Sequence, residues 1–156
     1  MAALSVLSIA VATGRAGYVL LNDGQLQDWG MTVKSVRSNN DLVGFAQRLI
    51  NDLQPDVFVT EDVSAGSCRK GRRAKTMIND LATLASHNEV LDVSVARPRT
   101  YPSKHEEAAA LAEIHPELAG YLPARKRRIF DYEPRGMILF EALVLASEVA
   151  GGSREG

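Results

Sequence analysis

Two neighbouring acidic residues follow what the sequence predicts to be a buried strand. Glu61 and Asp62 come directly after the apolar run Val57–Val59, whose β-branched and aromatic residues are typical of a strand buried on both faces. A carboxylate at the end of such a strand is costly to desolvate unless it is paired, and strand ends are where α/β proteins bind ligands. The alternative is that both acids open a solvated loop.

Another acid, Glu141, interrupts the apolar segment MILFEALVLA within a helix predicted over residues 135–150. A helix that is apolar on all sides is normally buried, so this carboxyl group must be paired, protonated, bound to a metal or directed at a polar opening. If the helix packs across the sheet, Glu61 and Glu141 could approach each other. Facing carboxylates repel unless a proton or a divalent cation lies between them, and Mg²⁺ or Mn²⁺ suits all-oxygen ligation. The alternative is a glutamate that reaches the surface.

The basic residues are clustered, although the chain has a formal net charge of only −1. Local clusters on a nearly neutral chain are typical of a face that binds a polyanion, and for each cluster a solvated helix face is the alternative. Tyr101 stands next to one cluster and could stack on a base. The clusters are Arg69, Lys70, Arg72, Arg73 and Lys75; Arg97, Arg99 and Lys104; and Arg125, Lys126, Arg127 and Arg128.

The elements that must position these residues follow from hydrophobic periodicity and turn signals. Asn22-Asp23-Gly24 predicts a hairpin, so the first strands form an antiparallel meander. Asn39, Asn40 or Asp41 is expected to cap the first helix, and Ser103 with Glu106 the third. The predicted strands cover 4–10, 18–21, 25–33, 57–59 and 90–95, and the predicted helices 41–53, 72–88, 104–114 and 135–150. Gly151 and Gly152 should end the last helix.

This order predicts one α/β domain over residues 1–150, with a five-stranded mixed sheet and helices on both faces. Residues 151–156 are expected to form a disordered tail. The single cysteine, Cys68, excludes an internal disulfide and is expected to be a bystander thiol. No apolar run approaches the roughly 18 residues of a membrane span, and the N-terminus lacks the basic region of a signal peptide. We therefore expect a cytoplasmic protein that does not enter membranes.

Taken in order, several segments resemble the ribonuclease H-like superfamily, and within it the RuvC-type Holliday junction resolvases. LSIAVATGRAGYVLLNDGQL is similar to that family's opening strand, glycine turn and second strand. PDVFVTED resembles its fourth strand, which ends in an acid. The basic helix with VLDVSVARPRTY resembles its next helix and fifth strand, and FEALVLA resembles its final helix.

The resemblance implies an endonuclease in which several carboxylates hold a pair of divalent ions that activate water and stabilise the leaving oxygen of a DNA phosphodiester. It carries over Glu61 and Glu141 as catalytic residues and metal ligands. The family's first-strand Asp falls on Ala10, which cannot bind a metal ion. A further helix acid falls near Met137 or Ile138. Asp131 and Glu133 could substitute only if the chain folds back.

The loss of the first-strand Asp predicts an impaired or inactive nuclease, either diverged naturally or substituted deliberately at Ala10. The resemblance also implies branched or duplex DNA as the partner, held by the basic clusters. It further implies a homodimer, in which an apolar helix such as 72–88 could pair across the two-fold axis. The alternative function is a non-catalytic module that binds nucleic acid or protein through the same fold.

Overall fold

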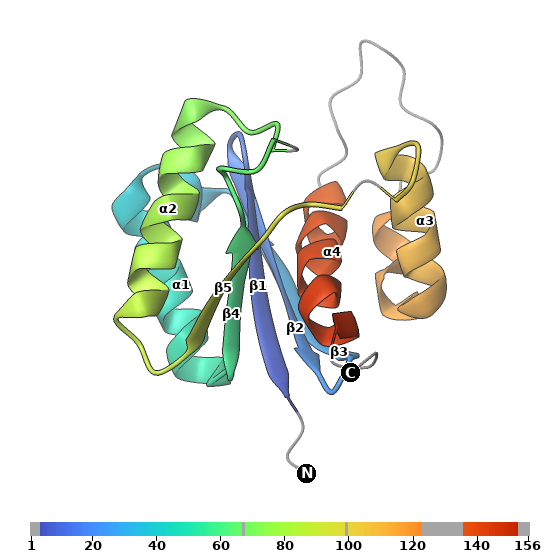
Figure 1. Ribbon diagram of the computed structural model, residues 1–156, viewed down its shortest axis with the longest axis horizontal. Helices are drawn as coiled ribbons and strands as arrows, with labels where there is room; N and C mark the ends of the chain where they lie inside the picture. Colours follow the sequence, from blue (N-terminus) through green and yellow to red (C-terminus); the bar gives the residue numbers. More distant parts are fainter. Residues whose placement is uncertain (1–3, 67, 99, 123–135, 153–156) are drawn as a thin grey trace.

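The computed structural model describes residues 4–66, 68–98, 100–122 and 136–152, and its centre is a five-stranded mixed sheet (Figure 1). The strand order is β3-β2-β1-β4-β5. β1 to β3 form an antiparallel meander, and β4 and β5 lie parallel to β1. The strands are β1 (Ser5–Ala12), β2 (Arg15–Asn22), β3 (Gln25–Thr32), β4 (Val57–Glu61) and β5 (Leu91–Val95). The predicted fold class and meander are confirmed.

The helices lie on both faces of this sheet (Figure 1). α1 (Asn39–Leu53) and α2 (Arg72–Ser86) pack on one face. α4 (Met137–Gly152) packs on the other, and α3 (Lys104–Ile114) lies against α4. Two short 3₁₀ helices, η1 (Lys34–Val36) and η2 (Pro116–Tyr121), complete the elements of the described residues. None of the helices in these ranges is long and apolar enough to cross a membrane.

Both hairpin turns of the meander are short. Asp23 and Gly24 connect β2 to β3 with φ angles of 53° and 81°, the left-handed geometry that an Asp-Gly hairpin adopts. Thr13 and Gly14 connect β1 to β2. This turn is shorter than the gap between the predicted strands 4–10 and 18–21, because Ala16 and Gly17 already pair with β1.

The helix ends differ from the expected ones in α1, α2 and α4, and α2 ends at Ser86 rather than at residue 88. Ser38 rather than a following residue caps α1, because its extended backbone lets the hydroxyl accept a hydrogen bond from the Asp41 amide. α4 continues to Gly152, beyond the expected end at residue 150, so the expected tail overlaps its last turn. The Ser103 cap of α3 is as expected.

The apolar side of α2 faces the sheet rather than solvent. Met77, Ile78, Leu81 and Ala85 are buried in the core between this helix, α1 and the sheet. A helix stabilised by such packing cannot offer the same side chains to a second subunit. The apolar side of this helix is therefore not available for a dimer contact, and pairing of the helix across a two-fold axis stays a prediction.

Alternation along the strands decides which residues lie on the α4 side of the sheet. Val6 and Ala10 of β1 pack in the α4 core, as do Val57 and Val59 of β4. Glu61 continues this alternation and therefore lies on the α4 side. The parallel register joins Val6 to Val57 and Ser8 to Val59, and continuing it places Ala10 level with Glu61.

A close contact between β2 and α4 sets the height of the helix above the sheet. Gly17 pairs with Ala10 on the neighbouring strand. A Cβ atom at Gly17 would lie 2.9 Å from Cγ2 of Ile138 and 3.3 Å from its backbone carbonyl carbon. The missing side chain therefore lets the first turn of α4 approach the sheet.

Candidate functional site

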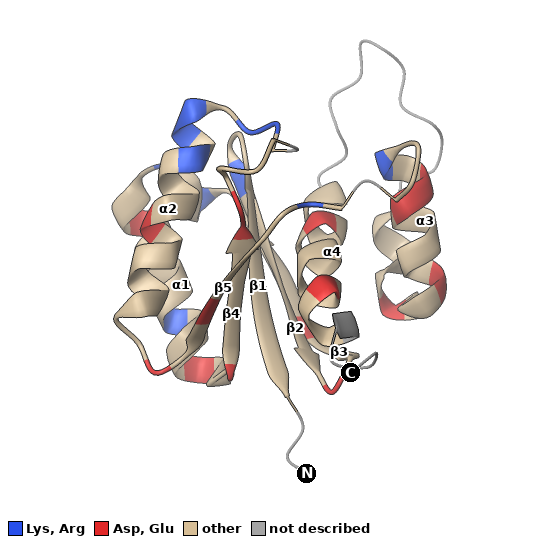
Figure 2. Cartoon of the chain, viewed as in Figure 1, with Lys and Arg blue, Asp and Glu red and all other residues tan. Residues whose placement is uncertain are grey.

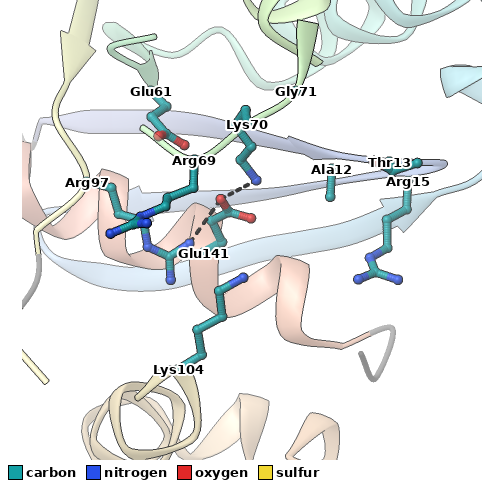
Figure 3. A pocket seen from close by; sticks show the side chains of 10 residues that line it. All are labelled: Ala12, Thr13, Arg15, Glu61, Arg69, Lys70, Gly71, Arg97, Lys104 and Glu141. Atoms are coloured by element: carbon teal, nitrogen blue, oxygen red, sulfur yellow. Dashed lines mark ion pairs between the residues drawn. The ribbon is translucent and has the colours of Figure 1, made fainter. Parts of the chain in front are cut away.

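A cavity of about 430 Å³ lies at the edge of the sheet where β1, β4 and β5 end. Its lining comes from the first hairpin, the end of β4, the loop before α2, the segment after β5, α3 and α4 (Figure 3). This is the carboxyl edge of the parallel strands, where α/β sheets bind ligands. The lining residues are Ala12, Thr13, Arg15, Glu61, Arg69, Lys70, Gly71, Arg97, Lys104 and Glu141.

The structure brings Glu61 and Glu141 to the same cavity, and both are almost fully buried, with exposed fractions of 4% and 5%. Glu61 is the last residue of β4, and Glu141 lies on the second turn of α4. Ala10 lies in the adjacent core with an exposed fraction of 3% and is not part of the lining. The roles of these positions in catalysis stay predictions.

Glu141 is held by two cations from different loops (Figure 3). Nζ of Lys70 lies 2.5 Å from Oε1 of Glu141, and Nη1 of Arg97 lies 3.0 Å from the same oxygen. Among the four possibilities that the sequence leaves for this acid, the structure shows pairing at a polar opening. Breaking such a buried pair is costly, because it leaves a charge without compensation.

Arg97 also connects α3 to the cavity. Its Nη2 lies 2.6 Å from Oε1 of Glu107, which is 7% exposed in the first turn of α3. Burial alone would lower the pKa of the Arg97 guanidinium, but the carboxylates of Glu141 and Glu107 raise this pKa above its ordinary value. Arg97 therefore remains charged and holds two elements together at one edge of the cavity.

The charge of the lining is strongly positive. Among the described residues it contains five basic side chains and two acidic ones, an excess of three positive charges. Counting Glu107, the second partner of Arg97, still leaves an excess of two. A site with this balance attracts anions and repels divalent cations.

The residues that the structure describes do not fit the divalent metal site that the resemblance implies. Within these ranges no group of three or more His, Cys, Asp or Glu side chains could hold a metal ion. Ala10 supplies no ligand, and both Met137 and Ile138 are buried apolar residues. Oε1 of Glu141 is already paired with both Lys70 and Arg97.

The predicted nucleic-acid-binding residues have different surroundings. Arg69, Lys70 and Lys104 line the cavity. Nη2 of Arg73 instead donates to the carbonyl oxygens of Val36 and Arg37, at 3.4 and 2.9 Å, and so ties α2 to η1. Arg72 is exposed, Lys75 is half-buried and Tyr101 is 43% exposed. Arg99, Arg125, Lys126, Arg127, Arg128, Asp131 and Glu133 lie outside the described residues.

Sequence reasoning missed the structural roles of Arg97 and Glu107 and the place of Arg15 in the lining. From the sequence, Arg97 is expected only to belong to a basic cluster that could bind a polyanion. A usable signal was present, because Arg97 follows a strand that is parallel to β4, so the two strand ends lie side by side. The pairing with Glu107 had no such signal.

Cys68 lies close to Glu61, but its surroundings do not make it a nucleophile. Burial raises the pKa of the Cys68 thiol above its ordinary value. The Lys70 backbone amide lowers this pKa, while the Glu61 carboxylate adds to the rise. The thiol is the less reactive form of cysteine, in agreement with the expected bystander role.

Ser103 positions α3, and with it Lys104 and Glu107, at the cavity. Its hydroxyl accepts a hydrogen bond of 3.2 Å from the Glu106 amide. We expect Ser103→Ala to lower the free energy of unfolding by about 1 kcal/mol, the usual cost of losing an N-cap. Urea denaturation should detect this loss. The matched control is Ser94→Ala, an exposed serine of β5, for which a change below about 0.5 kcal/mol is expected. Equal losses would show that the cap does not hold α3.

Comparison with known proteins supports this geometry at the level of the fold. No protein-family model matches the chain, and no curated protein matches its sequence. Solved structures do match it. Thermus thermophilus RuvC, solved in complex with a Holliday junction substrate, superposes with a TM-score of 0.60 at 14% identity, covering 98% of this chain and 96% of that one. The chain has the fold of the RuvC-type Holliday junction resolvases.

Other resolvases share the same fold. The Fowlpox virus resolvase, solved with Holliday junction DNA, has a TM-score of 0.62 at 11% identity, covering 96% of this chain and 99% of that one. The yeast mitochondrial Holliday junction resolvase Ydc2 has a TM-score of 0.55 at 13% identity, covering 94% and 78%. The RuvC-type fold therefore extends over nearly all of this chain.

Proposed function

We propose that this protein binds branched or duplex DNA on the face that carries the cavity, and that it does not cleave DNA by two-metal hydrolysis. One observation carries the proposal. At the strand ends of a resolvase fold, the acid expected on β1 is Ala10, and the acid on α4 is neutralised by Lys70 and Arg97. The fold suggests the substrate class, and the cations suggest binding without metal-dependent chemistry.

The distribution of charge supports DNA binding. Figure 2 shows Lys and Arg gathered at one end of the molecule, on the first turn of α2 and the loop before it, with further basic positions after β5 and at the start of α3. Arg69 is exposed at the cavity, and exposed Arg72 extends the basic surface beyond it. Lys and Arg side chains supply most of the affinity for a phosphate backbone, and this contribution weakens as salt rises.

Two further parts of the proposal depend on this function. A homodimer would match the two-fold symmetry of a junction, although its contact must use surfaces other than the buried apolar side of α2. The cytoplasmic location expected from the sequence agrees with a DNA-binding role. A non-catalytic module that binds protein is the alternative function, and it predicts no measurable DNA binding.

Cleavage of a labelled four-way junction tests the proposal. We expect neither the protein nor Ala10→Asp to cut the junction with Mg²⁺ or Mn²⁺, because Lys70 and Arg97 already occupy the Glu141 oxygen that a metal ion would need. Fluorescence anisotropy should show DNA binding that weakens steeply as salt rises.

Metal-dependent cleavage by the unchanged protein would overturn the non-catalytic part of the proposal. Cleavage by Ala10→Asp alone would indicate a nuclease inactivated at one position, and absence of binding would favour the protein-binding module.

A further inference from the structure

The volume and the charge of the cavity decide which ligands it can bind. Its volume of about 430 Å³ lies within the usual range of roughly 300–1,000 Å³ for ligand sites. The described residues of its lining have an excess of three positive charges. Most of its lining residues are polar or charged, so the cavity does not suit an uncharged ligand of drug size. The cavity therefore suits a small, strongly charged anion.

Buried ion pairs hold two of these cations, Lys70 and Arg97, in place. Arg97 is fixed between Glu107 on α3 and Glu141 on α4, and Lys70 is fixed to Glu141. Each of these cations has N–H donors beyond those that face the carboxylates. Donors held in place before binding need not be ordered by the ligand, which favours affinity. Lys70 and Arg97 thus form a preorganised pair of donors at the cavity wall.

Two cations of the protein lie against the carboxylate that a divalent metal would need. In an all-carboxylate site, a divalent cation would lie against the oxygens of Glu61 and Glu141. Here the Lys70 ammonium and the Arg97 guanidinium lie against the Glu141 oxygen instead. A divalent cation at this oxygen would have to displace both. The fixed cations of the protein hold the position that a metal ion would need.

We infer that the cavity is a metal-free binding site for a phosphate group, which contacts Lys70, Arg97 and Arg69 directly. The inference rests on the proposed function in one respect, namely that the phosphate belongs to a DNA backbone. A phosphodiester of DNA and free inorganic phosphate share the chemistry that these cations recognise. The experiment therefore tests both sources.

The first measurement compares DNA binding with and without divalent metal. Anisotropy titrations use a labelled duplex and a labelled four-way junction, in EDTA and in Mn²⁺, with the full chain. We expect the same Kd for the duplex in both buffers. A loss of binding in EDTA that Mn²⁺ restores would overturn the metal-free site.

The second measurement uses opposite charge changes in the lining. Lys70→Met should weaken duplex binding about tenfold and lower the salt slope by about one, as expected for one lost phosphate contact. Glu61→Gln removes a negative charge while keeping the shape of the side chain, and should tighten binding about threefold. A metal site predicts the reverse for Glu61→Gln, because it would lose a ligand. The direction in which Glu61→Gln changes the Kd therefore distinguishes a phosphate site from a metal site, even if Lys70→Met is poorly folded.

Lys34→Met is the matched control for Lys70→Met. Lys34 is an exposed lysine of η1 that lines a different depression, beside α1. We expect its Kd to stay within about twofold of the unchanged protein, since an isolated surface charge contributes little. If Lys34→Met weakens binding as much as Lys70→Met, the cavity is not the phosphate site.

Calorimetric titration with inorganic phosphate distinguishes the source. Binding of both duplex and phosphate, each weakened by Lys70→Met, supports the inference as stated. Phosphate binding without DNA binding would keep the anion site and overturn the proposed DNA function. DNA binding that neither Lys70→Met nor Glu61→Gln changes would keep the proposed function and overturn the cavity as its phosphate site.

Discussion

Replacing Arg97 with methionine should lower the free energy of unfolding by about 3–5 kcal/mol, the range for a buried ion pair that loses one partner. The Arg97 side chain is only 9% exposed and contacts Glu107 at 2.6 Å and Glu141 at 3.0 Å. Methionine keeps much of the length but none of the charge. Glu141 would keep Lys70, whereas Glu107 would lose the only ion-pair partner that the described residues give it. Urea denaturation measures the loss.

The control for Arg97→Met separates charge from packing. The double variant Arg97→Met with Glu107→Gln removes the carboxylate that the single change leaves without a partner. We expect it to be more stable than Arg97→Met alone, by about 1–3 kcal/mol. Arg48→Met, at an exposed arginine of α1, should change stability by less than about 0.5 kcal/mol. If the double variant is no more stable than the single one, the ion pairs do not hold α3 against the cavity.

Much of the fold could be predicted because its signals are local. The run Val57–Val59, the Asp23-Gly24 turn and the Ser103 cap each act within a few residues, and the structure confirms all three. The approach of Glu61 to Glu141 could also be predicted. A buried acid at a strand end and a buried acid in an apolar helix both need a polar neighbour, and one cavity serves both.

The partners of Glu141 could not be predicted in the same way. Lys70 comes from a loop and Arg97 from the segment after β5, and nothing in their local sequence directs them to α4. The pairing follows from where α4 lies on the sheet, which depends on packing between elements far apart in the chain. The sequence therefore predicted two carboxylates around a metal, whereas the structure places basic side chains against one of them.

The position of α4 depends in turn on the small residues beneath it. Ala10 and Gly17 face each other across β1 and β2, and the first turn of α4 lies over Gly17. The same packing explains why Ala10 belongs to the core rather than to the cavity lining. A larger residue at Gly17 must move the helix that carries Glu141, so the glycine of β2 contributes to the geometry of a cavity that it does not line.

Gly17→Val tests this dependence. Valine is well suited to a strand, so any loss must come from its contact with Ile138 rather than from β-propensity. A Cβ 2.9 Å from Cγ2 of Ile138 overpacks the core, and we expect the free energy of unfolding to fall by about 2–3 kcal/mol. Gly66→Val is the control, because nothing lies within 4 Å of a Cβ placed there.

A double-mutant cycle with Ile138→Ala then locates the strain. Ile138→Ala alone should be destabilising, since it removes a buried side chain from the α4 core. Combined with Gly17→Val it frees the space that the valine needs, so the loss in the double variant should be smaller than the sum of the single losses by at least about 1 kcal/mol. Additive losses would mean that Gly17 does not set the height of α4, and the link from the first hairpin to the Glu141 ion pairs would be wrong.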